Sequence, residues 1–146
     1  MEFSQERFDD VIDEAYALLE KHLKEVWIYP DMPLDLNYNM YKRMDAGGTY
    51  MVYVARVDKK IVGYSAYIIS PNLHHVESLW AYSDVLYLAP EHRGHGKEFI
   101  QYCESKLKDL GVHVISQAVT PRKDFSPMLE RSGYELMDSN YTRRLQ

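Results

Sequence analysis

The chain has 146 residues, a length typical of one domain. Hydrophobic residues make up 46% and charged residues 27%, which excludes wholesale disorder. The formal net charge of -5 argues against a broad basic surface for nucleic acid or for an anionic membrane. We therefore predict a single domain over residues 1–146, with neither a nucleic-acid partner nor a membrane association.

Cysteine content and apolar runs predict the compartment. Cys103 is the one cysteine, so no intrachain disulfide is possible and a reducing compartment is favoured. No run of about 18 apolar residues could span a bilayer. The acidic start MEFSQERFDD lacks the basic-then-apolar pattern of a signal peptide. We expect a cytoplasmic protein.

Helical spacing dominates the first 46 residues. Apolar residues recur at intervals of three and four over residues 5–27, which predicts a helix with Ser4 as its N-cap. A shorter helix is expected over residues 34–45, ended by Gly47 and Gly48.

The pattern then changes to strands rich in aromatic and β-branched residues. Asp58-Lys59-Lys60 is a turn candidate that would join the first two strands as a hairpin. Pro71-Asn72 is expected to end the second strand. Strands are predicted over residues 49–57, 61–69 and 76–88.

The last third of the chain alternates between the two periods. A helix is predicted over residues 97–110, with Gly111 as its C-terminal stop. Further elements are expected as follows: a buried strand over 112–118, a short helix over 125–132, and final strands over 134–138 and 140–145. This order predicts a mixed α/β fold with one strand–helix–strand crossover.

The segment LAPEHRGHGK is the most informative stretch. A strand that runs into a glycine-containing turn and then opens a helix is typical of an anion site, because the first amides of a helix have no intrahelical partner. Gly94 and Gly96 let the backbone approach a ligand, and Arg93 and Lys97 add charged donors. A plain strand–helix turn is the alternative interpretation.

Two nucleotide motifs fail on this segment. A Walker A loop would need Ser or Thr after Lys97, where Glu98 stands. A dinucleotide fingerprint starting at Gly94 would need a third glycine where Phe99 stands.

Three segments together resemble the GCN5-related N-acetyltransferase (GNAT) family: SDVLYLAPEHRGHGKEFI, VHVISQAV and MLERSGYEL. The resemblance extends from about residue 49 to the C-terminus, and DVLYLAPEHRG is most similar to small acetyltransferases of tailed phages and bacteria. It implies a mixed α/β fold whose central sheet is mostly antiparallel, with helices on both faces and a splayed central strand pair.

The resemblance also implies acetyl-CoA (coenzyme A) as cofactor. The family holds the pyrophosphate with a segment written Q/R-x-x-G-x-G/A, and its preceding strand holds the pantetheine arm through backbone groups. If Arg93 begins this motif, Glu98 stands where Gly or Ala is expected; if Gly94 and Gly96 are the small residues, Glu91 replaces Gln/Arg. By the resemblance the cofactor-binding residues are Leu86, Tyr87, Leu88, Arg93, Gly94, His95, Gly96, Lys97 and Glu98.

Acetyl transfer to an amine needs a base for the amine and a proton donor for the leaving thiolate. Asp84 is the candidate base, Glu77 is a weaker choice, and a purely structural carboxylate is the alternative. Strand alternation predicts that Asp84 shares one face with Trp80, Tyr82, Leu86 and Leu88.

The candidate proton donor has no clear position in the sequence. Many family members carry a tyrosine where this chain has Leu129. Ser126, Tyr134 or Tyr141 could replace it, and we name Ser126 and Tyr141 as candidate catalytic residues. Because this tyrosine is missing, a second hypothesis stands beside the enzyme: a binding or structural protein that has the GNAT fold but does not catalyse acetyl transfer.

We predict no metal site, because the chain has no H-E-x-x-H or C-x-x-C spacing. The acceptor is expected to be a small-molecule amine or a protein amine, and a homodimer is possible. Residues 1–36 hold ten acidic and three basic residues, so this segment could attract a cationic amine.

Overall fold

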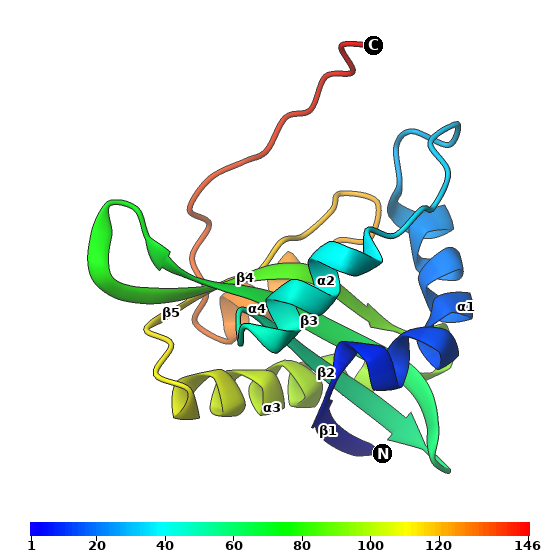
Figure 1. The fold of residues 1–146 in the computed structure, drawn as a ribbon, viewed down its shortest axis with the longest axis horizontal. Coiled ribbons are helices and arrows are strands. Elements are labelled where there is room, and N and C mark those ends of the chain that lie inside the picture. The colour runs from blue at the N-terminus through cyan, green and yellow to red at the C-terminus, as the bar shows by residue number, and fades with distance from the viewer.

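A computed structural model describes all of residues 1–146, which form a five-stranded sheet with helices on both faces (Figure 1). The strand order is β1-β2-β3-β4-β5, in which the first four strands are antiparallel and β5 runs parallel to β4. The predicted mixed α/β fold with a mostly antiparallel sheet is therefore confirmed. The elements are β1 (Glu2–Glu6), α1 (Phe8–Val26), α2 (Tyr38–Ala46), β2 (Tyr50–Val57), β3 (Lys60–Asn72), β4 (His75–Leu88), the 3-10 helix η1 (Pro90–His95), α3 (Gly96–Asp109), β5 (Val114–Ser116) and α4 (Ser126–Arg131).

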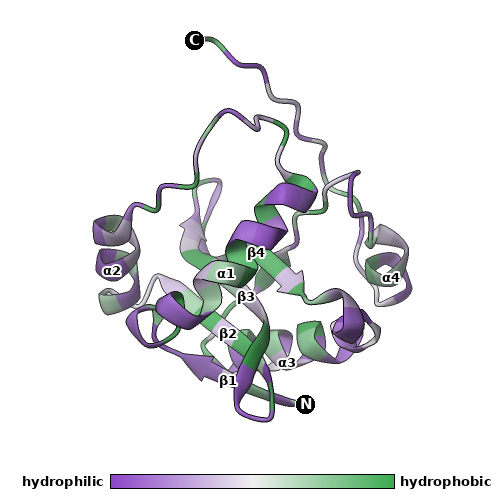
Figure 2. Cartoon of the chain, turned by 90° about the vertical axis from the view of Figure 1, so that its right-hand side faces the viewer, coloured by the Kyte–Doolittle hydropathy of each residue, from purple (hydrophilic) through white to green (hydrophobic).

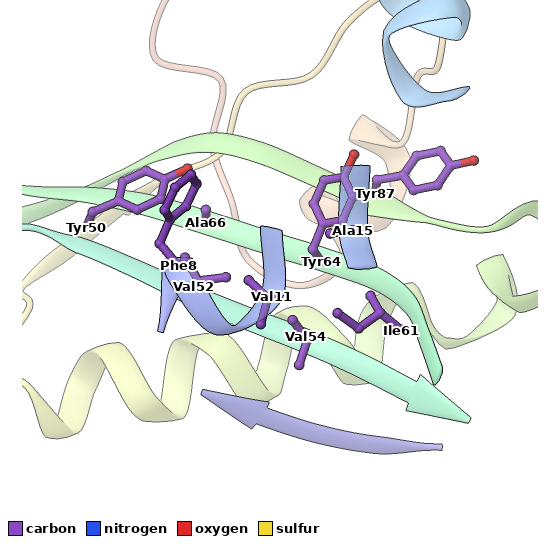
Figure 3. Packing of buried hydrophobic residues seen from close by; sticks show 10 residues of the cluster. All are labelled: Phe8, Val11, Ala15, Tyr50, Val52, Val54, Ile61, Tyr64, Ala66 and Tyr87. Atoms are coloured by element: carbon purple, nitrogen blue, oxygen red, sulfur yellow. The ribbon is translucent and has the colours of Figure 1, made fainter. Parts of the chain in front are cut away.

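Strand alternation sends side chains to two separate cores, one on each face of the sheet. One core lies under α1 and α2, and Figure 3 shows Phe8, Val11 and Ala15 of α1 packed over β2 and β3. The other lies under α3, where Phe99 and Cys103 are fully buried. Figure 2 shows apolar colour concentrated on the strands between α1 and α3.

The β2–β3 hairpin turns where the sequence predicts. Asp58 and Lys59 adopt positive φ values of 49° and 67°, as a tight two-residue hairpin turn requires. Farther along β3, Gly63 lies close to β4: a Cβ there would stand 2.7 Å from the Tyr87 carbonyl oxygen. The glycine therefore lets β3 pack directly against the last residues of β4.

The prediction of one helix over residues 5–27 is wrong at its start. Residues Glu2–Glu6 form the edge strand β1 on β2, and α1 begins only at Phe8. Ser4 is therefore not an N-cap; its hydroxyl donates to Glu6 within β1. The free edge of β2 and the stacking of Phe3 on Phe99 at 5.0 Å favour the strand over local helical spacing.

The second helix and the β3–β4 hairpin also differ in their bounds. α2 begins at Tyr38, later than predicted, because Asn37 caps it by accepting from the Met40 amide. β3 does not end at Pro71-Asn72 but runs through them, with a register shift at this point. Proline is tolerated in a strand beside such an irregularity.

Near the C-terminus the predicted strands are shorter or absent. β5 covers only Val114–Ser116 and is not buried, since Val114 is 36% exposed at the open edge of the sheet. The strands predicted over 134–138 and 140–145 are wrong, because this tail runs extended away from the sheet in Figures 1 and 2. A strand-like composition forms no strand without a partner strand. No helix combines the length and apolar character needed to cross a membrane.

Candidate active site

The candidate site is centred on an irregularity in β4. Ala66 pairs with Val85 and Tyr67 pairs with Ser83, so Asp84 is an extra residue with no partner on β3. Such a β-bulge re-aims the side chains that follow it. Val85 and Tyr87 consequently join the core under α1, whereas Leu86 packs on the α3 side.

The bulge corrects the predicted face of Asp84. Before the bulge, Asp84 alternates with Trp80 and Tyr82 as predicted. Beyond it, Leu86 and Leu88 lie on the opposite face, toward α3. Asp84 therefore lies on the α1/α2 face with the two aromatic residues, and its side chain is exposed.

Two tyrosines border the Asp84 carboxylate. Tyr50 on β2, which is 4% exposed, donates a 2.7 Å hydrogen bond from its hydroxyl to Oδ2 of Asp84. Burial and then the nearby carboxylate raise the pKa of Tyr50, so its hydroxyl stays protonated. Burial and the same carboxylate raise the pKa of Tyr41 on α2. An exposed carboxylate held on one oxygen can accept a proton on the other.

The backbone of β4 beyond Tyr82 has an open side. β5 pairs with β4 only over Trp80–Tyr82, so residues 83–88 have β3 on one side and no strand on the other. Unpaired strand N–H and C=O groups are ready hydrogen-bonding partners for an extended chain. The predicted cofactor residues Leu86, Tyr87 and Leu88 lie along this open edge.

The predicted pyrophosphate loop forms η1 and the first turn of α3. A Cβ added at Gly94 would meet no atom within 4 Å, and one at Gly96 would make only an ordinary contact. Both glycines have room for a side chain, so packing within the chain does not explain them. Space over a helix N-terminus fits an anionic group. Lys97 and Glu98 are exposed, and Glu98 is bonded by His95 at 3.1 Å rather than directed inward.

Arg93 is held by the protein itself. Its Nε donates to the Leu88 carbonyl oxygen at 3.1 Å, and its second nitrogen donates to Glu25 at 2.7 Å. Its guanidinium also lies 5.7 Å from the centre of the Tyr87 ring. Arg93 therefore joins the end of α1 to the loop that follows β4.

The candidate proton donors are not brought together. The Ser126 amide donates to Asp124 at the start of α4. Tyr141 is 95% exposed on the C-terminal tail, which leads away from β4 (Figure 1). Tyr134 donates a 2.5 Å hydrogen bond to Glu104 of α3. The structure does not bring Tyr141 to Asp84. No group of three or more His, Cys, Asp or Glu side chains comes together as a metal site.

A model of the "Acetyltransferase (GNAT) family" matches residues 12–134. The chain belongs to this family. The family uses acetyl-CoA, so acetyl-CoA is the cofactor and the chain is by family an acetyl-CoA-dependent acyltransferase. The open edge of β4 and the unexplained glycines fit that cofactor. No curated protein is similar enough in sequence to be matched.

Solved structures show that this GNAT chain has the fold of its family. An aminoglycoside acetyltransferase from an uncultured soil metagenomic sample, in complex with trehalose, is 15% identical over 99% of this chain and 96% of that one, with a TM-score of 0.76. A ribosomal-protein-alanine N-acetyltransferase from Brucella melitensis is 17% identical over 99% and 100%, with a TM-score of 0.73. An acetyltransferase from Clostridium acetobutylicum with acetyl-CoA is 14% identical over 99% and 96%, with a TM-score of 0.71.

Sequence reasoning missed three residues around the site. Tyr50 and Tyr41 come from segments that the resemblance does not cover residue by residue, and Glu25 from the first helix bonds Arg93. The number of tyrosines, 13, was the available signal. It could not indicate which hydroxyl reaches a carboxylate 34 residues away.

Proposed function

We propose that residues 1–146 act as one N-acetyltransferase domain that moves an acetyl group from acetyl-CoA to a primary amine by direct attack. The observation that carries the proposal is the exposed Asp84 carboxylate, which a buried tyrosine holds at the bulge where β4 loses its β5 partner. This arrangement offers a base beside an open strand edge. Such proton transfer is typically worth 10²–10⁴-fold in rate.

The chain's own residues have two tasks in this proposal. Asp84 accepts a proton from the ammonium form of the acceptor, so that the nitrogen lone pair becomes nucleophilic. Tyr50 keeps Oδ2 occupied and thereby directs the other carboxylate oxygen to the acceptor. When bound, acetyl-CoA supplies an activated thioester. The new N–C bond would then form as the C–S bond breaks, and the second proton lost by the attacking nitrogen would pass to the leaving thiolate.

The cofactor would lie along β4 and over the start of α3. We propose that backbone groups of Leu86, Tyr87 and Leu88 hold the pantetheine arm at the open edge. Backbone from Arg93 to Glu98, including His95 and Lys97, would hold the pyrophosphate. Support comes from the two glycines that have room for a ligand. Of the two candidate proton donors Ser126 and Tyr141, Ser126 lies on helix α4. We therefore propose Ser126 as the donor to the leaving thiolate.

For the acceptor, we propose a small-molecule amine. Among the structural neighbours is one described as an aminoglycoside acetyltransferase, which supports a small cationic acceptor. Another is described as a ribosomal-protein-alanine N-acetyltransferase, so a protein amine is the second candidate. The acidic segment 1–36 is compatible with either cation.

The rival function is a GNAT-fold protein without turnover, which Leu129 and the departures of the loop from the family motif favour. Calorimetry with acetyl-CoA tests the cofactor, and thiol release against a panel of primary amines tests turnover. Asp84→Asn should abolish most thiol release while acetyl-CoA still binds. Glu77→Gln changes the weaker candidate for the base, another exposed β4 carboxylate, and should leave thiol release unchanged if Asp84 is the base. Turnover that survives Asp84→Asn between pH 6 and 9 would remove Asp84 as the base.

A further inference from the structure

The C-terminal end of α1 carries a histidine that lies against the strands leading to η1. His22 is half-buried, and its ring stacks on the Tyr87 ring of β4, with centroids 4.9 Å apart and planes 26° apart. Its Nδ1 lies 3.0 Å from the hydroxyl of Tyr64 on β3. Figure 3 shows Tyr64 and Tyr87 side by side, with ring centroids 5.7 Å apart. His22 therefore connects α1 with both strands, although it takes no part in the proposed acetyl transfer.

The contact with Tyr64 fits the neutral form of His22. Tyr64 is 5% exposed, and burial raises the pKa of its hydroxyl, which therefore keeps its proton. A neutral imidazole can accept that proton in a hydrogen bond at Nδ1, whereas an imidazolium carries a proton on both nitrogens and cannot accept. Burial also lowers the pKa of His22, which favours the same neutral form.

Arg93 uses the same two neighbours as His22. Its guanidinium lies 5.7 Å from the centre of the Tyr87 ring and donates a 2.7 Å hydrogen bond to Glu25. Glu25 follows His22 by three residues on α1, so the two side chains are neighbours on the helix surface. A positive charge on His22 would therefore compete with Arg93 for the carboxylate and for the tyrosine ring.

One carboxylate serves all the positive charges at this end of α1. Lys123, between β5 and α4, lies 3.9 Å from the same oxygen of Glu25 that Arg93 contacts. A proton on His22 would thus add a third cation around Glu25. The titratable and charged groups that face His22 are Tyr64 of β3, Tyr87 of β4, Arg93 of η1 and Glu25 of α1 itself.

We propose that His22 is a positioning residue for the loop of residues 93–98, and that a proton on His22 weakens acetyl-CoA binding by loosening Arg93. This inference rests on the proposed place of the cofactor along β4 and over the start of α3. Arg93 also donates to the Leu88 carbonyl oxygen at 3.1 Å, so its position is coupled to the last residue of β4. By linkage, acetyl-CoA must then favour neutral His22, and its binding in mild acid releases a proton.

Two substitutions fix the charge of residue 22. His22→Asn takes up no proton, and its side-chain oxygen can accept from Tyr64 as Nδ1 does. His22→Arg is charged at every pH of the experiment. Calorimetry should give a Kd for acetyl-CoA about fivefold higher at pH 5.5 than at pH 7.5 in the wild type, and changed less than about twofold in His22→Asn. His22→Arg should bind at pH 7.5 as weakly as the wild type binds at pH 5.5.

The matched control is His75→Asn, at the exposed tip of the β3–β4 hairpin, which should keep the wild-type response to pH. Any effect of the loop histidines His92 and His95 is the same in all these variants and cancels in the comparison. Circular dichroism at pH 5.5 verifies that each protein is folded during the binding measurement.

A second readout uses the wild-type protein alone. The NMR signal of the His22 ring, assigned by its loss in His22→Asn, should titrate at lower pH with saturating coenzyme A than without it. A histidine that only supports the fold would titrate at the same pH in both samples. This measurement also decides the matter if His22→Arg does not fold.

The outcomes separate this inference from the proposed function. If acetyl-CoA binds but its Kd responds to pH equally in His22→Asn and the wild type, His22 does not position the loop. A His22 titration that coenzyme A leaves unchanged or moves to higher pH overturns the inference as well. In both cases thiol release from primary amines still tests the enzyme. The expected responses without turnover of any amine would support the inference and reject the enzyme. If neither acetyl-CoA nor coenzyme A binds at pH 7.5, both fail.

Discussion

The hydroxyl of Tyr50 on β2 donates a 2.7 Å hydrogen bond to Oδ2 of Asp84, the residue that the β4 bulge leaves without a partner. The two residues lie on different strands, with β3 between them in the sheet. One is buried and the other is exposed, so the bond runs from the core to the surface. The core under α1 therefore fixes the orientation of a carboxylate that a ligand can reach.

Removing the Tyr50 hydroxyl should impair turnover more than stability. In Tyr50→Phe the carboxylate loses its fixed donor but remains exposed to water, so no buried charge is left unpaired. We expect kcat to fall about tenfold, which corresponds to about 1.4 kcal/mol. The dissociation constant of acetyl-CoA should stay unchanged. Steady-state kinetics and calorimetry on the same preparation measure both.

Tyr53 provides the matched control on the same strand. It points to the other core, and its hydroxyl is buried without a hydrogen-bond partner. Tyr53→Phe removes an unsatisfied polar group, which is neutral or stabilising in a core. We expect unchanged kcat and an equal or higher Tm. An equal fall in kcat in both variants would show that the Tyr50 effect is not specific to Asp84.

The bulge explains why the site was only partly predictable. Sequence alternation places Asp84 with Trp80 and Tyr82 correctly, but continues to Leu86 and Leu88, which the structure puts on the other face. One extra residue in a strand leaves no local signature, because it is defined by the register of the neighbouring strand. Faces can therefore be predicted only as far as the first irregularity.

Gly63 should tolerate no side chain. In Gly63→Ala the new Cβ would stand 2.7 Å from the Tyr87 carbonyl oxygen and 2.4 Å from a Leu88 methyl group. Backbone cannot move aside as a flexible side chain does, so we expect a loss of about 1–3 kcal/mol in the free energy of unfolding. Because Tyr87 and Leu88 belong to the part of β4 whose other side is the open edge, acetyl-CoA affinity should fall too.

Gly94→Ala is the matched control for Gly63→Ala. A Cβ there would meet nothing within 4 Å, so Gly94→Ala should unfold at the same urea concentration as the wild type. Urea titration of both variants, followed by calorimetry with acetyl-CoA, tests the pair. A Gly63→Ala protein as stable as the wild type would mean that β3 and β4 can separate without cost.

Arg93 should stabilise the chain in the absence of cofactor. Its side chain bonds the Leu88 carbonyl oxygen and Glu25, so Arg93→Ala removes a link between α1 and the loop after β4. Both partners of the ion pair are about one-quarter to one-third exposed, which limits its strength. We expect the Tm without ligand to fall by a few degrees, and acetyl-CoA affinity to fall as well.

Lys97→Ala is the matched control for Arg93→Ala, because Lys97 should contribute charge to acetyl-CoA binding without stabilising the fold. It is exposed in the first turn of α3 and forms no ion pair with an acidic side chain. Lys97→Ala should lower acetyl-CoA affinity in a salt-dependent way and leave the Tm without ligand unchanged. Thermal unfolding with and without acetyl-CoA compares the two. An unchanged ligand-free Tm in Arg93→Ala would contradict the assigned link.

The helix ends could be predicted from local residues, whereas the edge strand and the C-terminal tail depend on contacts with distant parts of the chain. Gly47 and Gly111 end helices as expected, since glycine at a helix end acts locally. The sequence predicts a helix where β1 forms, and strands in the tail from residue 134, where none forms. β1 pairs with the edge of β2, whereas the strand-like residues of the tail have no partner strand. Such outcomes depend on residues far away in the sequence.

His22 should make the fold less stable in mild acid. It lies on α1, stacked on Tyr87 with centroids 4.9 Å apart, and its Nδ1 is 3.0 Å from the Tyr64 hydroxyl. Burial, and to a lesser extent the positive charge of Arg93, lower the pKa of His22 below 6.5, while Glu25 opposes them. The folded state therefore favours neutral His22, whereas the unfolded chain takes up a proton below pH about 6.5.

The direction in which pH changes the free energy of unfolding follows from this difference in proton uptake. The stability that neutral His22 contributes is present above pH about 6.5 and is lost as the pH falls through the lowered pKa of the folded state. Urea unfolding at pH 7.5 and 5.5 should show a smaller difference between the two pH values in His22→Gln than in the wild type. His75→Gln, at the exposed tip of the β3–β4 hairpin, should keep the wild-type difference. A His22→Gln variant that also keeps it would show that His22 does not link folding to pH.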